Sequence, residues 1–322
     1  MTIPRPAYCG RFAPSPTGPL HFGSLVAATG SFLEARERNG QWHLRMEDVD
    51  VPRCSTAAAG EILRVLEACG FTWDGEVIWQ SRRTDAYVAA LERLKARGQV
   101  YPCACTRREL ADSAIASDGA AIYPGTCRQG LPAGRTARAW RLAVGDARTS
   151  FDDAIQGRVA SDLGSEAGDF ILLRADGLFA YQLAVVVDDA EAGITHVVRG
   201  ADLLASTSRQ IFLQQCLEVP TPIYAHLPVV IDTAGEKLSK QTRAAPVDIS
   251  RPGPALFAAL EFLGQRPPLQ LSSASVPEIW SWARANWKLS RVPRGPALPG
   301  DRKNPSQWDN QTSSQKESDD CS

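Results

Sequence analysis

Apolar residues occur along this chain in short runs and at helical intervals, and the two patterns alternate. Short runs at residues 8–13 and 41–46 predict strands, whereas residues 24–39 carry apolar side chains on one helical face and predict a helix. Gly40 follows in the position of a C-terminal cap. Because strands joined by a helix are usually parallel neighbours in one sheet, this unit predicts a parallel α/β sheet.

The same patterns extend the sheet and interrupt it once. Helices are predicted over 56–69, 82–97 and 202–217. From residue 100 to 169, Gly, Pro, Arg and Cys become frequent, which predicts an insertion between two halves of the sheet. The second half is predicted from β-branched and apolar runs, typical of buried parallel strands, at 170–174, 184–187, 195–198 and 227–231.

Composition narrows the class of protein. The 35 Lys and Arg residues balance 36 Asp and Glu residues, so any contact with RNA is expected to be local. No apolar run approaches the length of a membrane span, and residues 1–6 lack the apolar stretch of a signal peptide. These features predict a cytoplasmic protein that does not enter the membrane.

Residues 11–24, Arg-Phe-Ala-Pro-Ser-Pro-Thr-Gly-Pro-Leu-His-Phe-Gly-Ser, connect the first predicted strand to the first predicted helix. The first N–H groups of a helix bind anions, and Gly18 and Gly23 let the backbone approach a ligand closely. His21 can donate a hydrogen bond to a phosphate. From these residues alone, a phosphate loop and a purely structural turn both stay open.

A second motif, Lys237-Leu238-Ser239-Lys240-Gln241, decides the resemblance. Together the two motifs resemble the signatures of class I aminoacyl-tRNA synthetases, and the wording of residues 11–18 resembles the glutamyl and glutaminyl branch. His21-Phe22-Gly23-Ser24-Leu25 resembles the short glutamyl-Q tRNA(Asp) synthetase family within that branch. The resemblance covers residues 8–287.

The resemblance implies ATP-dependent activation of L-glutamate, with Mg²⁺ accompanying the ATP. The attacking carboxylate is already ionised, so the step needs alignment and charge stabilisation rather than a general base. His21 and Lys240 are the expected catalytic residues. The expected ATP-binding residues are His21, Gly23, Lys237 and Lys240.

A glutamate site needs two cations for the carboxylates and one anion for the ammonium. The resemblance assigns Arg11 and Arg199 to the carboxylates, Glu47 to the ammonium and Tyr181 as an added hydroxyl, and it leaves open which Arg binds which carboxylate. All four are expected near carboxyl ends of strands, where ligands bind in open α/β sheets. Strand-end salt bridges and a core tyrosine are the alternatives. The full expected set is Arg11, Phe12, Ala13, Pro14, Ser15, Glu47, Tyr181 and Arg199.

Three cysteines cluster in the insertion. The spacing of Cys103, Cys105 and Cys127 suits a structural zinc site, although three free thiols would give the same pattern. The resemblance implies Tyr123 as the fourth ligand. Zinc here would organise a segment that is short of hydrophobic core.

The resemblance also sets the predicted domains: a class I synthetase Rossmann-type parallel sheet with a zinc-containing insertion and a short helical C-terminal segment. Residues 288–322 lose apolar periodicity and gain polar residues, Pro and Gly, so no fold is expected there. The predicted segments are 1–99 and 170–245 for the two catalytic halves, 100–169 for the insertion, 246–287 for the helical segment and 288–322 for the tail.

The expected partner is the anticodon stem-loop of tRNA(Asp), whose queuosine would accept the glutamate from a monomeric enzyme. Roughly eighty residues follow the lysine motif, where glutamyl-tRNA synthetases carry an anticodon-binding module. Two alternatives are a truncated glutamyl-tRNA synthetase that charges the 3′ end of tRNA(Glu) and a non-catalytic zinc-containing RNA-binding paralogue. The basic residues expected on RNA phosphates are Arg107, Arg108, Arg128 and Arg135.

Overall fold

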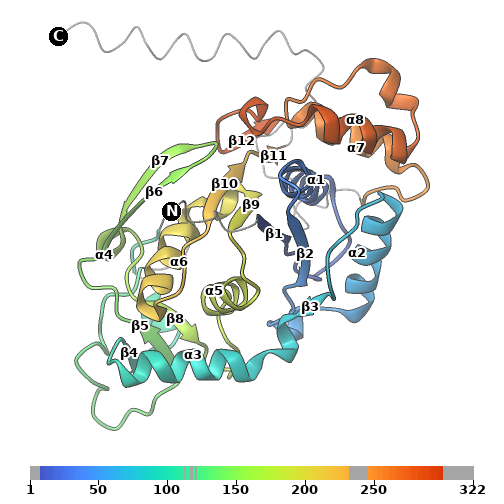
Figure 1. Ribbon diagram of the computed structural model, residues 1–322. Coiled ribbons are helices and arrows are strands. Elements are labelled where there is room, and N and C mark those ends of the chain that lie inside the picture. The colour runs from blue at the N-terminus through green and yellow to red at the C-terminus, as the bar shows by residue number, and fades with distance from the viewer. Residues whose placement is uncertain (1–7, 112, 117–118, 120–121, 232–245, 300–322) are drawn as a thin grey trace, which may run out of the picture.

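The structure is a computed structural model that describes residues 8–111, 113–116, 119, 122–231 and 246–299 (Figure 1). The predicted lysine motif, including Lys237 and Lys240, lies outside the described residues.

Parallel strands form the centre of the molecule, as the sequence predicts. The strand β1 (Cys9–Phe12) pairs with β2 (Gln41–Met46), which pairs with β3 (Ile78–Trp79). A second parallel pair, β9 (His196–Gly200) and β10 (Ile223–Leu227), lies beside β1. The backbone of Thr195 donates to the carbonyl of Cys9 and joins the two pairs.

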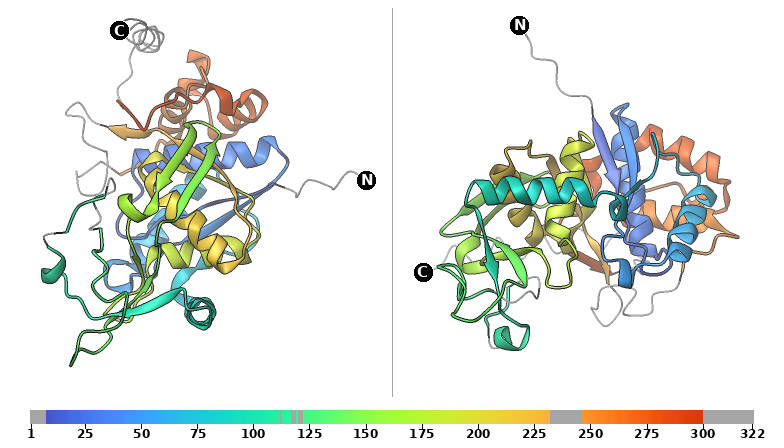
Figure 2. Two further views of the ribbon diagram at one scale, coloured as in Figure 1. Left: turned by 90° about the vertical axis from the view of Figure 1, so that its left-hand side faces the viewer. Right: turned by 90° about the horizontal axis from the view of Figure 1, so that it is seen from below.

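Helices cover this centre and connect its strands (Figures 1 and 2). The helix α1 packs on β1, β2 and β9, and the close approach of Gly30 to Leu227 brings it against β10. Asn39, with φ of 52°, takes the left-handed position after α1, and not Gly40 as the sequence predicts. Gly40 is needed for another reason, since a Cβ there would lie 2.6 Å from Tyr8. The helices of the two catalytic halves are α1 (Phe22–Glu37), α2 (Thr56–Ala68), α3 (Thr84–Ala96), α5 (Tyr181–Glu191) and α6 (Leu204–Leu217).

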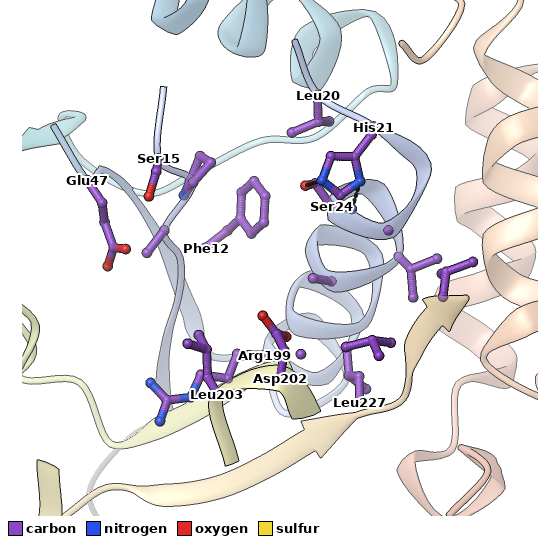
Figure 3. Close-up of a pocket in the computed structure, with 18 of the residues that line it drawn as sticks. Phe12, Ser15, Leu20, His21, Ser24, Glu47, Arg199, Asp202, Leu203 and Leu227 are labelled. Carbon is purple, nitrogen blue, oxygen red and sulfur yellow. Dashed lines mark hydrogen bonds between the residues drawn. The ribbon is translucent and has the colours of Figure 1, made fainter. Parts of the chain in front are cut away.

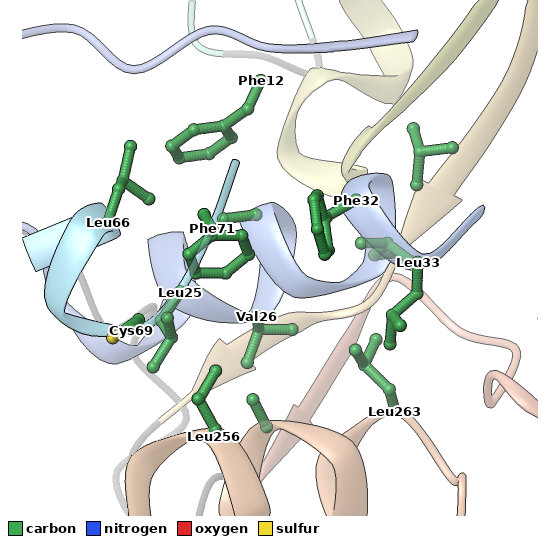
Figure 4. Packing of buried hydrophobic residues seen from close by; sticks show 14 of the residues in the cluster. Phe12, Leu25, Val26, Phe32, Leu33, Leu66, Cys69, Phe71, Leu256 and Leu263 are labelled. Atoms are coloured by element: carbon green, nitrogen blue, oxygen red, sulfur yellow. The ribbon is translucent and has the colours of Figure 1, made fainter. Parts of the chain in front are cut away.

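Buried apolar side chains fix α1 to its neighbours, and Figure 4 shows Phe32 and Phe71 among them. Phe32 is fully buried and meets the rings of Trp42, Phe71 and Trp280 edge-on at centroid distances of 5.0–5.3 Å. Trp280 comes from α8 (Val276–Asn286), which with α7 (Pro252–Phe262) forms the helical C-terminal segment. Edge-on aromatic contacts add to the stabilisation from burial, so this cluster holds α1 in a fixed place.

The predicted insertion contains its own sheet and a hairpin. The strands β4 (Val100–Cys103), β5 (Ala139–Leu142) and β8 (Phe170–Leu173) are antiparallel. The hairpin of β6 (Arg148–Asp153) and β7 (Gly157–Asp162) leads into the short helix α4 (Leu163–Glu166) and lies against β10 and α6. Short 3-10 helices complete the described chain at Val51–Arg53, Gln80–Arg82, Arg108–Leu110, Ala201–Leu203, Leu269–Ser273 and Leu289–Arg291.

One predicted strand is wrong, and another pairs differently from the prediction. Residues 184–187 belong to α5, because the helix is buried between α3 and α6 and is apolar on nearly all sides; its tertiary packing outweighs the small helical penalty of valine. Residues 170–173 do form a strand, β8, but it pairs antiparallel with β5 and does not extend the parallel sheet.

The prediction that the tail has no fold is wrong for residues 288–299. Val292 is buried in the core, and β12 (Ala297–Pro299) pairs in parallel with β11 (Val229–Ile231). The backbone hydrogen bonds of a distant strand hold this segment, and such a partner leaves no trace in local composition. Residues 300–322 lie outside the described residues.

Candidate active site

A cavity of about 790 Å³ opens at the carboxyl ends of β1, β2, β9 and β10 (Figure 3). It contains every predicted glutamate-binding residue and the two predicted ATP-binding residues that lie in the described part of the chain. Tyr181 differs in one respect from the expectation, because it begins α5 and does not end a strand. The predicted residues that line the cavity are Arg11, Phe12, Ala13, Pro14, Ser15, His21, Gly23, Glu47, Tyr181 and Arg199.

The N-terminus of α1 faces this cavity. His21 is the N-cap residue, and its Nδ1 accepts a hydrogen bond of 3.3 Å from the backbone N–H of Ser24. The Ser24 hydroxyl lies 3.1 Å from His21 Nε2. The structural and functional interpretations of His21 are therefore compatible, because the side chain that caps the helix also lines the cavity where the helix N-terminus attracts anions.

One end of the cavity is built from alternating buried charges. Asp189 of α5 lies between two guanidiniums: its Oδ1 is 3.2 Å from Arg11 Nε and 2.6 Å from Arg45 Nη1. Arg45 in turn lies 3.2 Å from Glu47. Burial raises the pKa of Asp189, but Arg11 and Arg45 outweigh this effect and hold it below its ordinary value. For Glu47, burial outweighs Arg45 and Arg11, so its pKa is raised.

The neighbouring carboxylate, Asp188, anchors α5 from the other side. It accepts hydrogen bonds from Gln80 at 2.8 Å, Tyr87 at 2.8 Å and Arg83 at 2.6 Å. These partners belong to the segment that ends in α3. Consecutive aspartates therefore fasten α5 to two different parts of the fold, and this fastening fixes the position of Tyr181 at the start of the helix.

Arg199 has a different environment. Its guanidinium donates to four side chains, namely His226 at 3.1 Å, Tyr181 at 3.4 Å, Thr207 at 2.7 Å and Gln210 at 2.7 Å. Burial lowers the pKa of His226 to about 4, so the imidazole is neutral at neutral pH. Arg199 is 5% exposed, so its guanidinium is buried among neutral partners.

Several residues of the site were missed from the sequence. Asp189, Arg45 and His226 lie in apolar stretches that resemble plain core, and only the burial of a charged group in such a run could have signalled them. Asp202 also lines the cavity, and its place at the start of the helix predicted over 202–217, soon after the strand predicted at 195–198, was an available signal.

The predicted metal ligands lie together. The three thiol sulfurs of Cys103, Cys105 and Cys127 are all within 4.8 Å of one another, and the Tyr123 hydroxyl lies 3.5 Å from the first and 3.4 Å from the second. Two sulfurs bound to one tetrahedral zinc would be about 3.8 Å apart, and a sulfur and an oxygen about 3.5 Å apart. The Cys105–Cys127 distance of 3.7 Å fits, so these residues suit a zinc ion.

Arg141 supports this cluster. Its Nε donates to Cys103 at 3.3 Å, and its guanidinium lies 3.8 Å from the centre of the Tyr123 ring. Burial raises the pKa of the Cys103 thiol, but the hydrogen bonds from Tyr123 and Arg141 outweigh it and the pKa lies below its ordinary value. The ionised thiolate is the form that binds a metal, so a lowered thiol pKa favours metal binding.

Comparisons with known proteins agree with this site. Residues 9–252 match the family model of the class I tRNA synthetases (E and Q), catalytic domain. The fold is similar to that of a glutamate-tRNA synthetase from Elizabethkingia anophelis, with a TM-score of 0.76 at 24% identity over 91% of this chain and 68% of that one. The fold and the cavity thus define a class I synthetase catalytic domain.

Curated relatives are much more similar in sequence. The chain is 65% identical over 289 residues to a glutamyl-Q tRNA(Asp) synthetase of Aromatoleum aromaticum, covering 90% of this chain and 91% of the relative. It is 61% identical to one of Dechloromonas aromatica, covering 89% and 96%. The chain belongs to the glutamyl-Q tRNA(Asp) synthetase family, and the family predicted from its two motifs is confirmed. Each helix among the described residues is too short or too polar to cross a bilayer.

Proposed function

We propose that this protein activates L-glutamate with ATP and transfers it to the queuosine of tRNA(Asp). A glutamate carboxylate oxygen attacks the α-phosphorus of Mg²⁺-bound ATP, and the bond to pyrophosphate breaks. A hydroxyl of the queuosine cyclopentenediol then attacks the acyl carbon, loses its proton and releases AMP. The product is an ester on the anticodon loop.

The observation that carries the proposal is the charge of the cavity. Its buried end holds the guanidiniums of Arg11, Arg45 and Arg199 against the carboxylates of Asp189 and Glu47, and these five groups leave one net positive charge. Two further carboxylates are not part of this count, because Asp188 is paired with Arg83 and Asp202 is exposed to solvent. Glutamate has one net negative charge, whereas glutamine has none. Burial of a charged group is favourable only when a partner compensates it, so this cavity favours glutamate.

The remaining roles follow the predicted assignments. Glu47 would bind the ammonium, and the N-terminus of α1 with His21 and Gly23 would hold the ATP phosphates. Lys237 and Lys240 would add positive charge to the phosphates. Loss of one such stabilising donor typically costs about 100-fold in rate, so Lys240→Ala should slow ATP–pyrophosphate exchange by that order.

The acceptor is tested with tRNA(Asp) from cells that make queuosine and from cells that do not. We expect radiolabelled glutamate to enter only the queuosine-containing tRNA. Removal of the 3′-terminal nucleotide spares queuosine, so the trimmed tRNA should still accept glutamate. If trimming abolishes acceptance, the protein charges 3′ ends, as a truncated glutamyl-tRNA synthetase would. If no tRNA accepts glutamate and glutamate supports no pyrophosphate exchange, with or without tRNA, the non-catalytic alternative is favoured.

We also propose that Cys103, Cys105, Tyr123 and Cys127 hold a structural zinc ion. The sulfur and oxygen distances support this assignment. Elemental analysis of protein purified without chelator should give one zinc per chain. Cys103→Ser should lose the metal and unfold at a lower temperature, whereas Cys54→Ser, outside the cluster, should retain it. Wild-type protein without zinc would contradict the assignment.

The RNA surface is proposed to include the exposed arginines near the cysteine cluster. Arg128 pairs with Asp169 and Arg135 with Glu109, so these two side chains already have a fixed direction. A monomer would bind one anticodon stem-loop, with Arg107 and Arg108 among its phosphate contacts. Neutral substitution of Arg107 should weaken tRNA binding and reduce its salt dependence, while exchange with free glutamate stays unchanged.

A further inference from the structure

Three buried side chains from distant segments form a line that ends at the cavity. Asp153 ends β6 of the hairpin, His226 lies in β10, and Arg199 lies in β9. Asp153 Oδ2 is 2.6 Å from His226 Nδ1, and His226 Nε2 is 3.1 Å from Arg199 Nε. All three residues are at most 5% exposed.

The contacts determine which ring nitrogen of His226 carries the proton. The carboxylate of Asp153 can only accept a hydrogen bond, so Nδ1 must donate to it. Nε2 faces the Nε–H of Arg199, which can only donate, so Nε2 must be unprotonated. The Thr207 hydroxyl lies 3.0 Å from both Nε2 and the Leu203 carbonyl, and it can turn its single proton from that carbonyl to Nε2, so this contact is compatible with the tautomer.

The orientation of Asp153 is fixed as well. Its Oδ1 accepts three backbone N–H groups, those of Ile155 at 3.0 Å, Gln156 at 2.8 Å and His226 at 3.1 Å. Only Oδ2 faces the imidazole. An asparagine at this position would keep its oxygen on the three N–H groups and present its amide nitrogen, a donor, to His226 Nδ1.

We propose that Asp153 and His226 are positioning residues for the glutamate site: the carboxylate sets the imidazole tautomer, and the imidazole holds the Arg199 fork towards the amino acid. With Nε bound to His226 and Nη2 bound to Thr207 and Gln210, Nη1 is the nitrogen on the side of Tyr181, a residue of the cavity wall. This inference rests on the proposed function, since it assumes that Arg199 binds glutamate. The hairpin of the insertion thereby becomes part of amino-acid recognition.

Asp153→Asn is the first test. It should reverse the tautomer and oppose two donors, Nε2–H and Arg199 Nε–H. Glutamate-dependent ATP–pyrophosphate exchange should show a KM for glutamate raised roughly 10- to 100-fold, the range for one lost hydrogen bond to a charged group, with the KM for ATP unchanged. Asp152→Asn is the matched control, because the exposed Asp152 on the same strand pairs with Arg158. A change below twofold in Asp153→Asn would overturn the proposal.

Two substitutions of His226 separate positioning from packing. A glutamine side chain can place its oxygen near Nε2 and keep the acceptor for Arg199, whereas an asparagine reaches only the Nδ1 position. His226→Gln should therefore have a lower KM for glutamate than His226→Asn by about tenfold. Equal values would contradict a role through Arg199, and this comparison decides the matter if Asp153→Asn does not fold.

The double variant, Asp153→Asn with His226→Gln, tests whether Asp153 acts through His226. Glutamine has no tautomer, so Asp153→Asn should add less than twofold to the KM of His226→Gln. If Asp153→Asn raises the KM by the same factor in His226→Gln as in the protein with His226 intact, Asp153 acts independently of the imidazole and the proposal is wrong.

Failure of the proposed function is distinguishable from failure of this inference. A wild-type protein without glutamate-dependent exchange would refute the proposed function. The tautomer would still be measured by ¹⁵N NMR, because the chain has only four histidines. We expect Nδ1 of His226 to be protonated in the wild type and Nε2 in Asp153→Asn; the same tautomer in both would overturn the inference.

Discussion

Arg11 and Arg199 both project from parallel strands into the same cavity, but they are held by opposite means. Arg11 is bound by a carboxylate, Asp189, which it shares with Arg45. Arg199 is bound by an imidazole, two hydroxyls and an amide, all neutral. The protein compensates the charge of one guanidinium itself and leaves the other to be compensated by a ligand.

The difference indicates a division of work. A buried charge without a counterion is costly, and neutral hydrogen-bond acceptors offset only part of that cost. Arg199 is therefore the group whose free energy a bound carboxylate lowers most. Arg11 stays paired with Asp189 whether or not a ligand is bound, because that carboxylate belongs to the protein. Removal of Asp189 would leave two buried cations, Arg11 and Arg45.

The largest predicted effect concerns Arg11, the arginine that is paired with a carboxylate. Asp189→Asn should lower the free energy of unfolding by about 3–5 kcal/mol, since it leaves Arg11 and Arg45 buried without their shared anion. Urea unfolding would measure this change. Glu191→Gln is the control on the same helix, because its salt bridge with Arg83 is exposed and should contribute less than about 1 kcal/mol. A similar loss in both variants would contradict the comparison.

The same pair predicts the pH dependence of stability. The folded-state pKa of Asp189 lies below its unfolded value of about 3.9, so its stabilisation is complete at neutral pH. It is lost as the pH falls below about 4 and through the lowered folded-state pKa. Asp189→Asn should therefore flatten the acid limb of the stability profile, measured by thermal unfolding between pH 6 and 2.5. An unchanged acid limb would show that Asp189 is not paired in solution.

A substitution of Arg199, whose direct partners are neutral, should affect activity more than stability. Arg199→Met removes a charge whose direct partners are all neutral, so no charged group in contact with it loses its partner. We expect the KM for glutamate to rise about 100-fold, as for a lost charge-assisted contact, while the free energy of unfolding falls less than in Asp189→Asn. Arg158→Met in the exposed hairpin is the control. Equal stability losses in the Asp189 and Arg199 variants would remove the distinction drawn here.

A feature could be predicted from the sequence when the residues that indicate it lie close together in the chain. The strand, turn and helix of residues 8–39 were predictable because apolar spacing, glycines and His21 lie together in the chain. Residues 184–187 were mistaken for a strand because burial on all sides removes the periodicity that identifies a helix. Asp153 and Asp189 could not be assigned, since the side chains they pair with lie at least 73 residues away and only the fold brings them together.

The smallest predicted effect concerns Thr207, one of the four neutral side chains that bind Arg199. Thr207 accepts from Arg199 Nη2 at 2.7 Å and donates to the carbonyl of Leu203 at 3.0 Å. Thr207→Val keeps the shape of the side chain and removes both bonds, so one donor of Arg199 loses an acceptor. A hydrogen bond to a charged group contributes about 1.5–3 kcal/mol, and Gln210 still accepts from the same nitrogen, so we expect the low end of this range, a KM for glutamate raised about tenfold in pyrophosphate exchange. Thr207→Ser retains the hydroxyl and should match the wild type. If valine has no effect while Arg199→Met does, Thr207 does not orient Arg199, and its orientation is set by the other three contacts, with His226, Tyr181 and Gln210.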